Sequence, residues 1–146
     1  MLEVQGDIWN FHSKGEWIAI TTNGTVRKDG ACVMGRGIAF QTANKFPKVP
    51  YQIGRMLGTY GNVPLCLRDV RIVTFPVKFH WKDRADLGLI EDSARGLIER
   101  ITMLDLDKLY MVRPGCGNGR LDWLEEVKPV LVEILDNRFI IVERGG

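Results

Sequence analysis

The chain has 146 residues, of which 45% are hydrophobic, and its 20 basic and 18 acidic side chains leave a formal net charge of +2. This length can bury a core without disulfides or a metal, so we expect a single domain over residues 1–146. The balanced charge, with no long run of like charges, argues against a strongly basic nucleic-acid-binding protein.

The cysteines indicate the compartment. Cys32, Cys66 and Cys116 are odd in number and far apart, which favours neither a disulfide framework nor a zinc site. We therefore expect a reducing, cytoplasmic location and no bound metal. Residues 1–17 lack a basic segment followed by an apolar one, and no apolar run reaches membrane-spanning length. We expect a soluble chain that does not associate with membranes.

Apolar runs rich in β-branched residues predict the strands. They lie at 17–22, 70–77, 108–112 and 138–142, and each is nearly continuous, as is typical of strands covered on both faces. The stretch "LCLRDVRIV" predicts a hairpin that turns near Arg68 and Asp69. Some antiparallel pairing should therefore accompany parallel strands.

Helical periods lie between these runs. Apolar residues recur at helical spacing over 53–60 and 87–101, and again over 127–135. The third helix follows Asp122, where Asp-x-x-Glu resembles a capping box; Pro129 either kinks this helix or marks where its regular part begins. The alternation of strands and helices predicts an α/β fold with a mixed, sandwiched sheet.

Two glycine-rich loops follow predicted strands. Residues 21–37 leave the first strand and residues 113–123 leave the strand at 108–112. Ligands bind such sheets beyond the carboxyl ends of the strands, and each loop leads into a helix whose N–H groups attract anions. Glycines at 35, 37, 115, 117 and 119 would let the backbone approach phosphate oxygens, so two phosphates are expected. The alternative is that each loop is only a cap or a tight turn.

Five stretches then stand in the order typical of one family: "GDIW", "ITTNG", "VMGRGIAFQTANKFP", "IVTFPVKFHW" and "RPGCGNGRLDW". The chain resembles the macro domains, which bind ADP-ribose, over nearly its whole length. It is most similar to the branch with antitoxin macro domains that remove ADP-ribose from DNA thymine and a human hydrolase of terminal ADP-ribosyl glutamate. The resemblance implies a three-layer α/β/α fold with a central mixed, mostly parallel sheet, and ADP-ribose as ligand or product without another cofactor.

The resemblance also implies the ligand contacts. Asp7, with the Ile8 backbone beside it, matches the contact to the adenine amino group, although Asp7 can equally be a helix N-cap. Asn23 matches the asparagine facing the distal ribose, and Trp9 is a candidate for stacking on adenine. The first phosphate loop matches Gly35, Arg36, Gly37 and Ile38, and the second matches Gly115, Cys116, Gly117, Asn118 and Gly119.

Lys78 matches the lysine that this branch uses on the anomeric carbon, and Asn23 is expected to act with it. An amine can attack there, open the ribose and form a Schiff-base-type intermediate that water releases. The amine must be partly neutral, so burial or a nearby cation should lower its pKa. His80 is two residues further on, and either relays a proton or holds the loop.

One position departs from the family pattern. The glutamate-directed hydrolase has an aspartate where this chain has Gly119, so cleavage of glutamate esters by that route is not expected. Cys116, although it lies between glycines, has no histidine assigned as its base, and we interpret it as a packed small residue.

We therefore expect a monomeric hydrolase that removes ADP-ribose from a macromolecule, with DNA thymine as the favoured substrate. Two alternatives remain open: an ADP-ribose reader without catalysis, and a phosphatase of phosphorylated ADP-ribose. Lys78 separates the first of these from the hydrolase, because a reader would tolerate the loss of its amine.

Overall fold

A computed structural model describes residues 1–144. Its sheet has six strands in the order β1-β6-β5-β2-β4-β3, and all neighbours are parallel except β3 and β4. The mixed, mostly parallel sheet and the hairpin near Arg68 are thereby confirmed. The strands are β1 (Leu2–Gln5), β2 (Ile18–Asn23), β3 (Cys66–Leu67), β4 (Ile72–Lys78), β5 (Leu109–Met111) and β6 (Phe139–Glu143).

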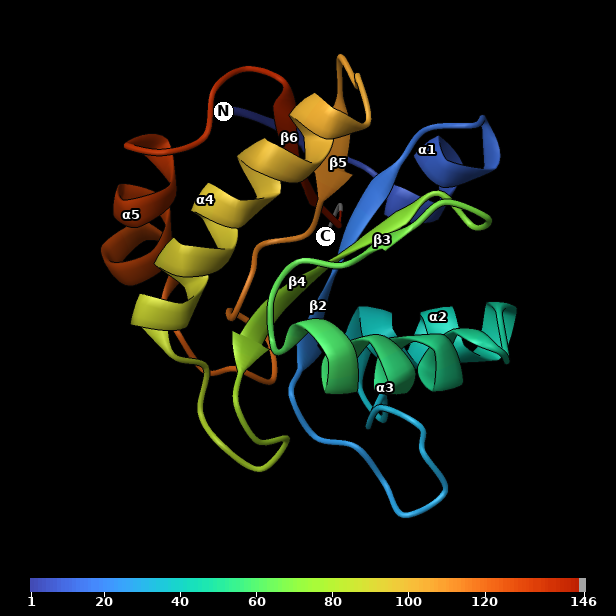
Figure 1. Ribbon diagram of the computed structural model, residues 1–146. Helices are drawn as coiled ribbons and strands as arrows, with labels where there is room; N and C mark the ends of the chain where they lie inside the picture. Colours follow the sequence, from blue (N-terminus) through green and yellow to red (C-terminus); the bar gives the residue numbers. More distant parts are fainter. Residues whose placement is uncertain (145–146) are drawn as a thin grey trace.

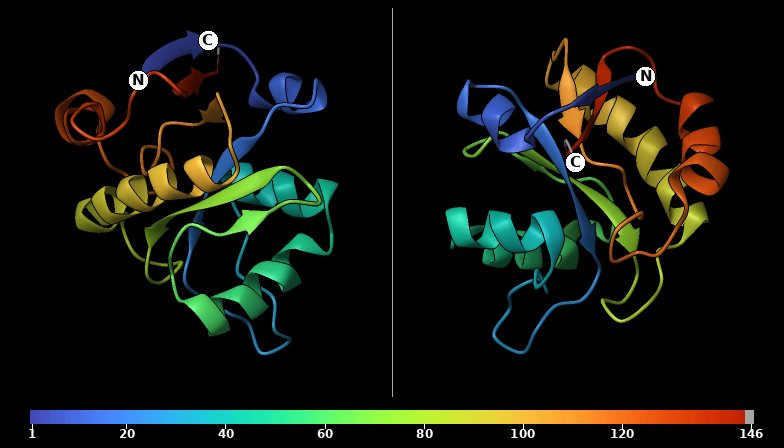
Figure 2. Two further views of the ribbon diagram at one scale, coloured as in Figure 1. Left: turned by 45° about the horizontal axis from the view of Figure 1, so that its top comes forward. Right: turned by 180° about the vertical axis from the view of Figure 1, so that it is seen from behind.

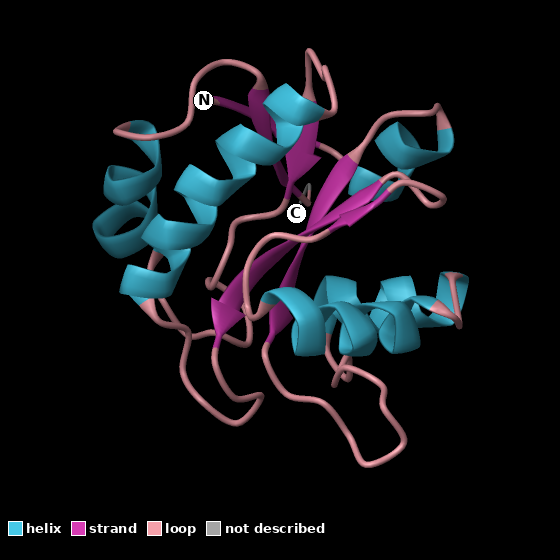
Figure 3. Ribbon diagram, viewed as in Figure 1, coloured by secondary structure: helices cyan, strands magenta, loops and turns pink. Residues whose placement is uncertain are grey.

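Helices cover both faces of this sheet (Figures 1 and 3). One face carries α1 (Ile8–Ser13), α2 (Gly37–Lys45) and α3 (Val49–Tyr60). The other carries α4 (Leu87–Met103), the π-helical turn η1 (Trp123–Val127) and α5 (Lys128–Val132). The view from behind in Figure 2 shows the two groups of helices on opposite sides of the strands. This is the three-layer α/β/α arrangement that the family resemblance implies.

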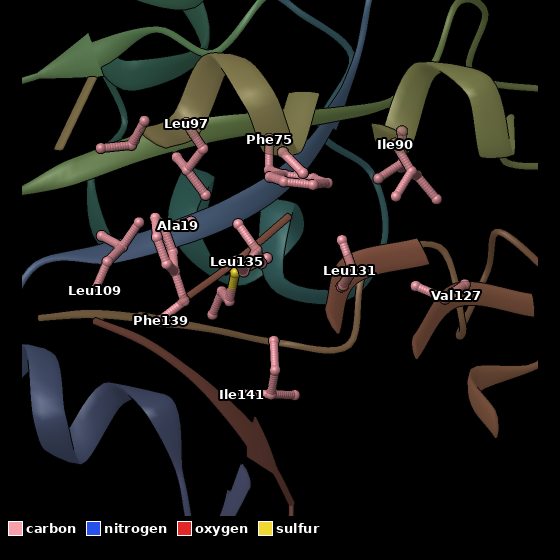
Figure 4. Close-up of a cluster of buried hydrophobic side chains, with 14 of the residues drawn as sticks. Ala19, Phe75, Ile90, Leu97, Leu109, Val127, Leu131, Leu135, Phe139 and Ile141 are labelled. Carbon is pink, nitrogen blue, oxygen red and sulfur yellow. The ribbon is translucent and has the colours of Figure 1, made fainter. Parts of the chain in front are cut away.

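The strands supply side chains to a core on each face. Along β2, Ile18 and Ile20 point toward the helices α1 to α3, while Ala19 points toward α4 and α5. Each is at most 1% exposed, which is why the strand reads as a continuous apolar run. Figure 4 shows the cluster on the α4 side, where Phe75 and Phe139 lie among aliphatic side chains.

Two elements differ from the prediction. Strand β1 was not expected, because its four residues are all exposed and its only pairing is with β6 at the edge of the sheet. The helix after Asp122 begins as a π turn. Asp122 accepts a hydrogen bond from the Glu125 N–H (2.7 Å), but the carboxylate that binds the Asp122 N–H in return belongs to Glu126 (3.0 Å). Pro129 is the second residue of α5, so it marks the start of the regular helix.

The connections of the two central strands create a crevice. The chain leaves β2 toward α2 on one face, whereas it leaves the neighbouring strand β5 toward η1 and α5 on the other. Ligands of open α/β sheets bind where connections diverge in this way. In the described residues, no helix combines the length and the hydrophobicity needed to cross a membrane.

Candidate functional site

A cavity of about 860 Å³ opens at this crevice. It is lined by Asn23 at the end of β2, by Lys78 at the end of β4, and by both glycine loops, including residues 35–38 and 115–119. A second cavity of about 370 Å³ is lined by Asp7, Ile8 and Trp9 and shares Gly37 and Ile38 with the first. The two cavities therefore adjoin, and together they are lined by every predicted site residue except His80.

Strand pairing brings Asn23 and Lys78 together. They are partners in the parallel register of β2 and β4, with a bulge between Thr22 and Asn23. The Asn23 Nδ2 donates to the Val33 carbonyl and its Oδ1 accepts from the Thr25 N–H, each at 3.0 Å. The amide thus orders the loop after β2, and each of its ends keeps one further hydrogen-bonding position for a ligand.

The Lys78 amine lies between the two loops that follow β4 and β5. Its Nζ is 3.4 Å from the Trp81 carbonyl and 3.4 Å from the Asn118 carbonyl. Burial lowers the pKa of Lys78, and the positive charges of Arg120 and Arg36 lower it further, against the opposing effect of Asp83. A larger fraction of the amine is therefore neutral, which is the form that attacks carbon.

The first glycine loop ends at the N-terminus of α2. Arg36 is the N-cap residue, and no side chain caps the N–H groups of the first turn. These N–H groups and the positive end of the helix dipole suit an anion. Gly37 has a φ of +59°, which disfavours a side chain, and Gly35 has open space where a Cβ would lie.

The glycines of the second loop are required for two different reasons. A Cβ at Gly119 would lie 2.5 Å from the Gly115 oxygen and 2.7 Å from the Ala85 Cβ, and Gly115 itself has a φ of +77°. These two positions pack against the protein. Gly117, by contrast, has no atom within 4 Å of its Cβ position. Of the glycines in this loop, only Gly117 leaves open space in which a ligand can approach the backbone.

Cys116 has no environment that would activate a thiol. Burial raises its pKa to about 11, and its Sγ is 3.4 Å from the Pro114 carbonyl. It also packs against the core on the α4 side. At neutral pH the group is a protonated thiol, which is a poor nucleophile. This agrees with its interpretation as a packed small residue.

Asp7 and His80 both have local structural roles. Asp7 accepts from the Trp9 N–H at 2.9 Å and so caps α1, while also lining the smaller cavity. The exposed His80 lines neither cavity. Its Nδ1 accepts from the Lys82 N–H, and its own N–H donates to Asp83, both at 3.2 Å. Of the two expectations for His80, its contacts match the holding of the loop.

Trp81, Arg27 and Arg113 line the main cavity but were not predicted as site residues. Trp81 directly follows His80, and the pattern Lys-x-His-Trp was available as a signal. Arg113 forms a salt bridge with Glu143 at 3.1 Å and lies over the Trp123 ring. Nothing local in the sequence indicates that contact.

Comparison with known proteins points to one family, although no family model matches the chain. A DNA ADP-ribosyl glycohydrolase of Thermus aquaticus is 32% identical over 115 residues, which is 71% of this chain and 31% of that protein. A protein of the same name from Mycobacterium tuberculosis is 31% identical over 109 residues, which is 68% of this chain and 31% of that protein. The chain therefore spans about a third of the length of these curated relatives.

Solved structures agree with these relatives. The macrodomain of Mycobacterium tuberculosis DarG superposes with a TM-score of 0.73 and 25% identity, and that of Thermus aquaticus DarG with 0.70 and 27%. Each match covers 99% of this chain and 97% of the other. The Thermosipho africanus DarTG, solved with ADP-ribose, has the same fold at a TM-score of 0.71 and 22% identity. Likeness in fold over nearly both whole chains, joined to the sequence similarity, shows that this protein belongs to the macrodomain family.

Proposed function

We propose that this domain binds ADP-ribose and hydrolyses the bond between an ADP-ribosyl group and a macromolecule, with a DNA base as the substrate. The single observation that carries the proposal is the Lys78 amine: it is partly buried, it is influenced by two arginines, and it lines a cavity together with two glycine loops. The similar proteins named DNA ADP-ribosyl glycohydrolases support the choice of DNA.

The proposed ligand extends through both cavities. Adenine lies in the smaller one, where Asp7 keeps one carboxylate oxygen that accepts no hydrogen bond from the described residues. The two phosphates lie against the uncapped N-terminus of α2 and the Gly117 backbone. The distal ribose then lies near Asn23, with its anomeric carbon toward Lys78. This order follows from the lining residues: Asp7 lines only the smaller cavity, Gly37 at the start of α2 lines both, and Lys78 lines only the larger one.

The reaction proposed for Lys78 begins with its neutral amine. The nitrogen lone pair forms a bond to the anomeric carbon while the bond from that carbon to the base breaks. The base leaves with the electron pair and takes the proton that the lysine nitrogen loses. The ribose ring then opens: the nitrogen forms a double bond to the anomeric carbon, and its remaining proton passes to the ring oxygen, which gives the Schiff-base-type intermediate. Water adds to the same carbon and releases the lysine and free ADP-ribose. Asn23 holds the ribose hydroxyls with the hydrogen-bonding positions that its loop contacts leave available.

The test compares Lys78→Ala and Lys78→Arg with the wild-type protein. We expect both variants to lose release of ADP-ribose from modified thymidine in single-stranded DNA, by at least about 100-fold, because neither supplies a neutral amine. Calorimetric titration should show that Lys78→Ala still binds ADP-ribose within a few-fold of wild type.

Three outcomes would change the conclusion. Wild-type protein that binds ADP-ribose but leaves DNA-linked, glutamate-linked and phosphorylated substrates intact is a reader. Activity on the phosphorylated ligand alone indicates a phosphatase. No heat and no thermal shift with ADP-ribose would remove the proposed site altogether.

We also propose that the domain acts as a monomer in a reducing, cytoplasmic compartment. The support for a reducing compartment is that Cys32, Cys66 and Cys116 are all free thiols. Light scattering tests the monomeric state, and thiol counting on protein purified without a reductant tests whether the three cysteines stay unpaired.

A further inference from the structure

Residues 79–84, which we call the aromatic loop, present two large apolar side chains to solvent. Phe79 is 58% exposed and Trp81 is 41% exposed, and Trp81 also lines the main cavity. In Figure 1 this loop, after β4, lies beside the loop after β2 at one end of the molecule. An exposed tryptophan at the edge of a cavity can offer the flat face of its ring to a ligand.

The aromatic loop is held in one conformation by its own contacts. The backbone N–H of Trp81 donates to the Thr25 hydroxyl at 3.0 Å, and this hydrogen bond connects the aromatic loop to the loop that follows β2. The Asp83 N–H donates to the His80 carbonyl at 3.0 Å, and the His80 ring lies 6.0 Å from the Trp81 ring at an angle of 28°. These hydrogen bonds hold the backbone of the loop, and the Lys82 Nζ lies 5.3 Å from the centroid of the Trp81 ring, so a base that stacks on this face displaces or joins that ammonium group.

Positive charge is concentrated on the three loops around the cavity. Residues 24–36, 78–84 and 113–122 hold eight lysines and arginines and three aspartates, a net charge of +5. Two of these arginines pair with glutamates outside the three ranges, Arg84 with Glu126 and Arg113 with Glu143. All three aspartates are engaged: Asp29 with Arg27, Asp83 with the His80 N–H, and Asp122 as a helix cap. Arg36, Lys82 and Arg120 form no salt bridge among the described residues. The low net charge of the chain thus conceals a basic cavity rim.

From these observations we propose that Trp81 stacks on a nucleobase next to the modified one in single-stranded DNA, while Lys82 and its basic neighbours contact the flanking phosphates. The inference rests on the proposed function and adds a strand-binding surface to it. The Lys78 Nζ is 3.4 Å from the Trp81 carbonyl, so a base that leaves at Lys78 lies directly beside the aromatic loop. Exposed aromatic rings combined with cations are the usual means of binding single strands.

The test uses two substrates that differ only in the flanking strand: ADP-ribosylated thymidine as a nucleoside, and the same unit within a single-stranded oligonucleotide. We expect Trp81→Ala to lower kcat/KM on the oligonucleotide about tenfold more than on the nucleoside, the size of one lost base stack. Trp81→Phe keeps a stacking ring and should recover most of the difference. Tyr60→Ala removes an aromatic side chain that is 64% exposed elsewhere and serves as the matched control.

Salt dependence tests the role of charge. The measured quantity is the slope of log KM against log salt concentration. If Lys82 contacts a phosphate, Lys82→Ala should reduce this slope by about one for the oligonucleotide and leave it unchanged for the nucleoside. Lys14→Ala, which removes an exposed lysine at the end of α1, should leave both unchanged.

An equal loss on both substrates would overturn the inference, since Trp81 would then act only on the ADP-ribosyl group. Inactivity of the wild-type protein on both substrates would instead refute the proposed hydrolysis. The surface is then tested by fluorescence anisotropy with unmodified, labelled oligothymidylate, where equal affinity of wild type and Trp81→Ala would refute it.

Discussion

Lys78 shows how a single residue acquires its chemistry from neighbours that are distant in the sequence. Burial, Arg120 and Arg36 all act to lower its pKa, and the Asn118 carbonyl lies 3.4 Å from its amine. None of these neighbours is on the same strand. An ordinary surface lysine would be almost fully protonated at neutral pH, so this environment is what makes attack by the amine feasible.

The first prediction concerns pH. Because the Lys78 pKa is lowered, the neutral amine forms at a lower pH than in a free lysine, and kcat/KM should rise with pH and level off above that pKa. Arg120→Gln removes one of the cations, so it should raise the Lys78 pKa and move the rising part of the profile to higher pH. A profile that does not move in this variant would contradict the assigned cause.

The second prediction concerns Gly119, where the glutamate-directed relative has an aspartate. A side chain here would collide with the Gly115 oxygen and Ala85, so Gly119→Asp should lower the free energy of unfolding by about 1–3 kcal/mol without conferring glutamate esterase activity. Gly117→Ala is the control, since its Cβ position is open and the change should cost less than about 1 kcal/mol. Urea denaturation measures both. Equal stability of the two variants would show that the loop adjusts.

At the scale of elements, the turn before α5 is shaped by its proline. Pro129 has no N–H to donate to the Glu125 carbonyl, and its ring would crowd that carbonyl in a regular helix. The chain responds with the wider π turn over Trp123–Val127, and this moves the reciprocal capping carboxylate from Glu125 to Glu126. The extra residue in this turn explains why the Asp-x-x-Glu spacing predicted Glu125, and not Glu126, as the acceptor of the Asp122 N–H.

This displacement gives the third prediction. Glu126→Ala should lower the free energy of unfolding by about 0.5–1 kcal/mol, because Glu126 accepts from the Asp122 N–H and also forms a salt bridge with Arg84 at 3.2 Å. Glu125→Ala, one residue earlier, should be nearly neutral. Thermal melts of the two variants side by side measure the difference, and a larger effect at Glu125 would contradict the observed cap.

At the scale of the whole molecule, the sheet is buried between two hydrophobic clusters. Phe75 is fully buried among side chains of β4, α4 and α5, while Ile53 is 1% exposed on the α3 side. Adjacent residues of each central strand point into opposite clusters. If one cluster unfolds and its strands lose their structure, the other cluster loses the same strands that it packs against. We propose on this ground that residues 1–144 unfold as one cooperative unit.

The fourth prediction tests that cooperativity. Phe75→Ala should cost about 3–5 kcal/mol and Ile53→Ala about 2–5 kcal/mol, because each leaves a cavity in a close-packed cluster. Both variants should still unfold in a single transition when followed by far-ultraviolet circular dichroism and by tryptophan fluorescence. Two separate transitions, or probes that disagree in either variant, would indicate independent units.

Where a local pattern determines position, the sequence indicated where the candidate site residues lie on the sheet. The run before Lys78 is a strand, so the lysine had to lie at the carboxyl edge of the sheet, and the two glycine loops follow strands of the same sheet. Asn23 and Lys78 could be expected near each other for the same reason, since parallel strands end at one edge. The expectation that His80 lies on the same side as Lys78 was weaker. His80 is two residues beyond the end of the strand, where the chain turns and side chains no longer alternate between the two faces of the sheet.

The sequence by itself determined the order of the four long strands and of the helices between them, the sandwiched sheet and the loops that meet at its edge, because apolar periodicity and glycine act over a few neighbouring residues. Only the tertiary structure decided which glycines pack and which leave space for a ligand, that Trp81 rather than His80 lines the cavity, and that β1 pairs with β6. These features depend on contacts between segments far apart in the chain, such as Gly119 with Ala85 or Trp81 with Thr25. No local pattern encodes such a contact, so it exists only once the sheet has formed.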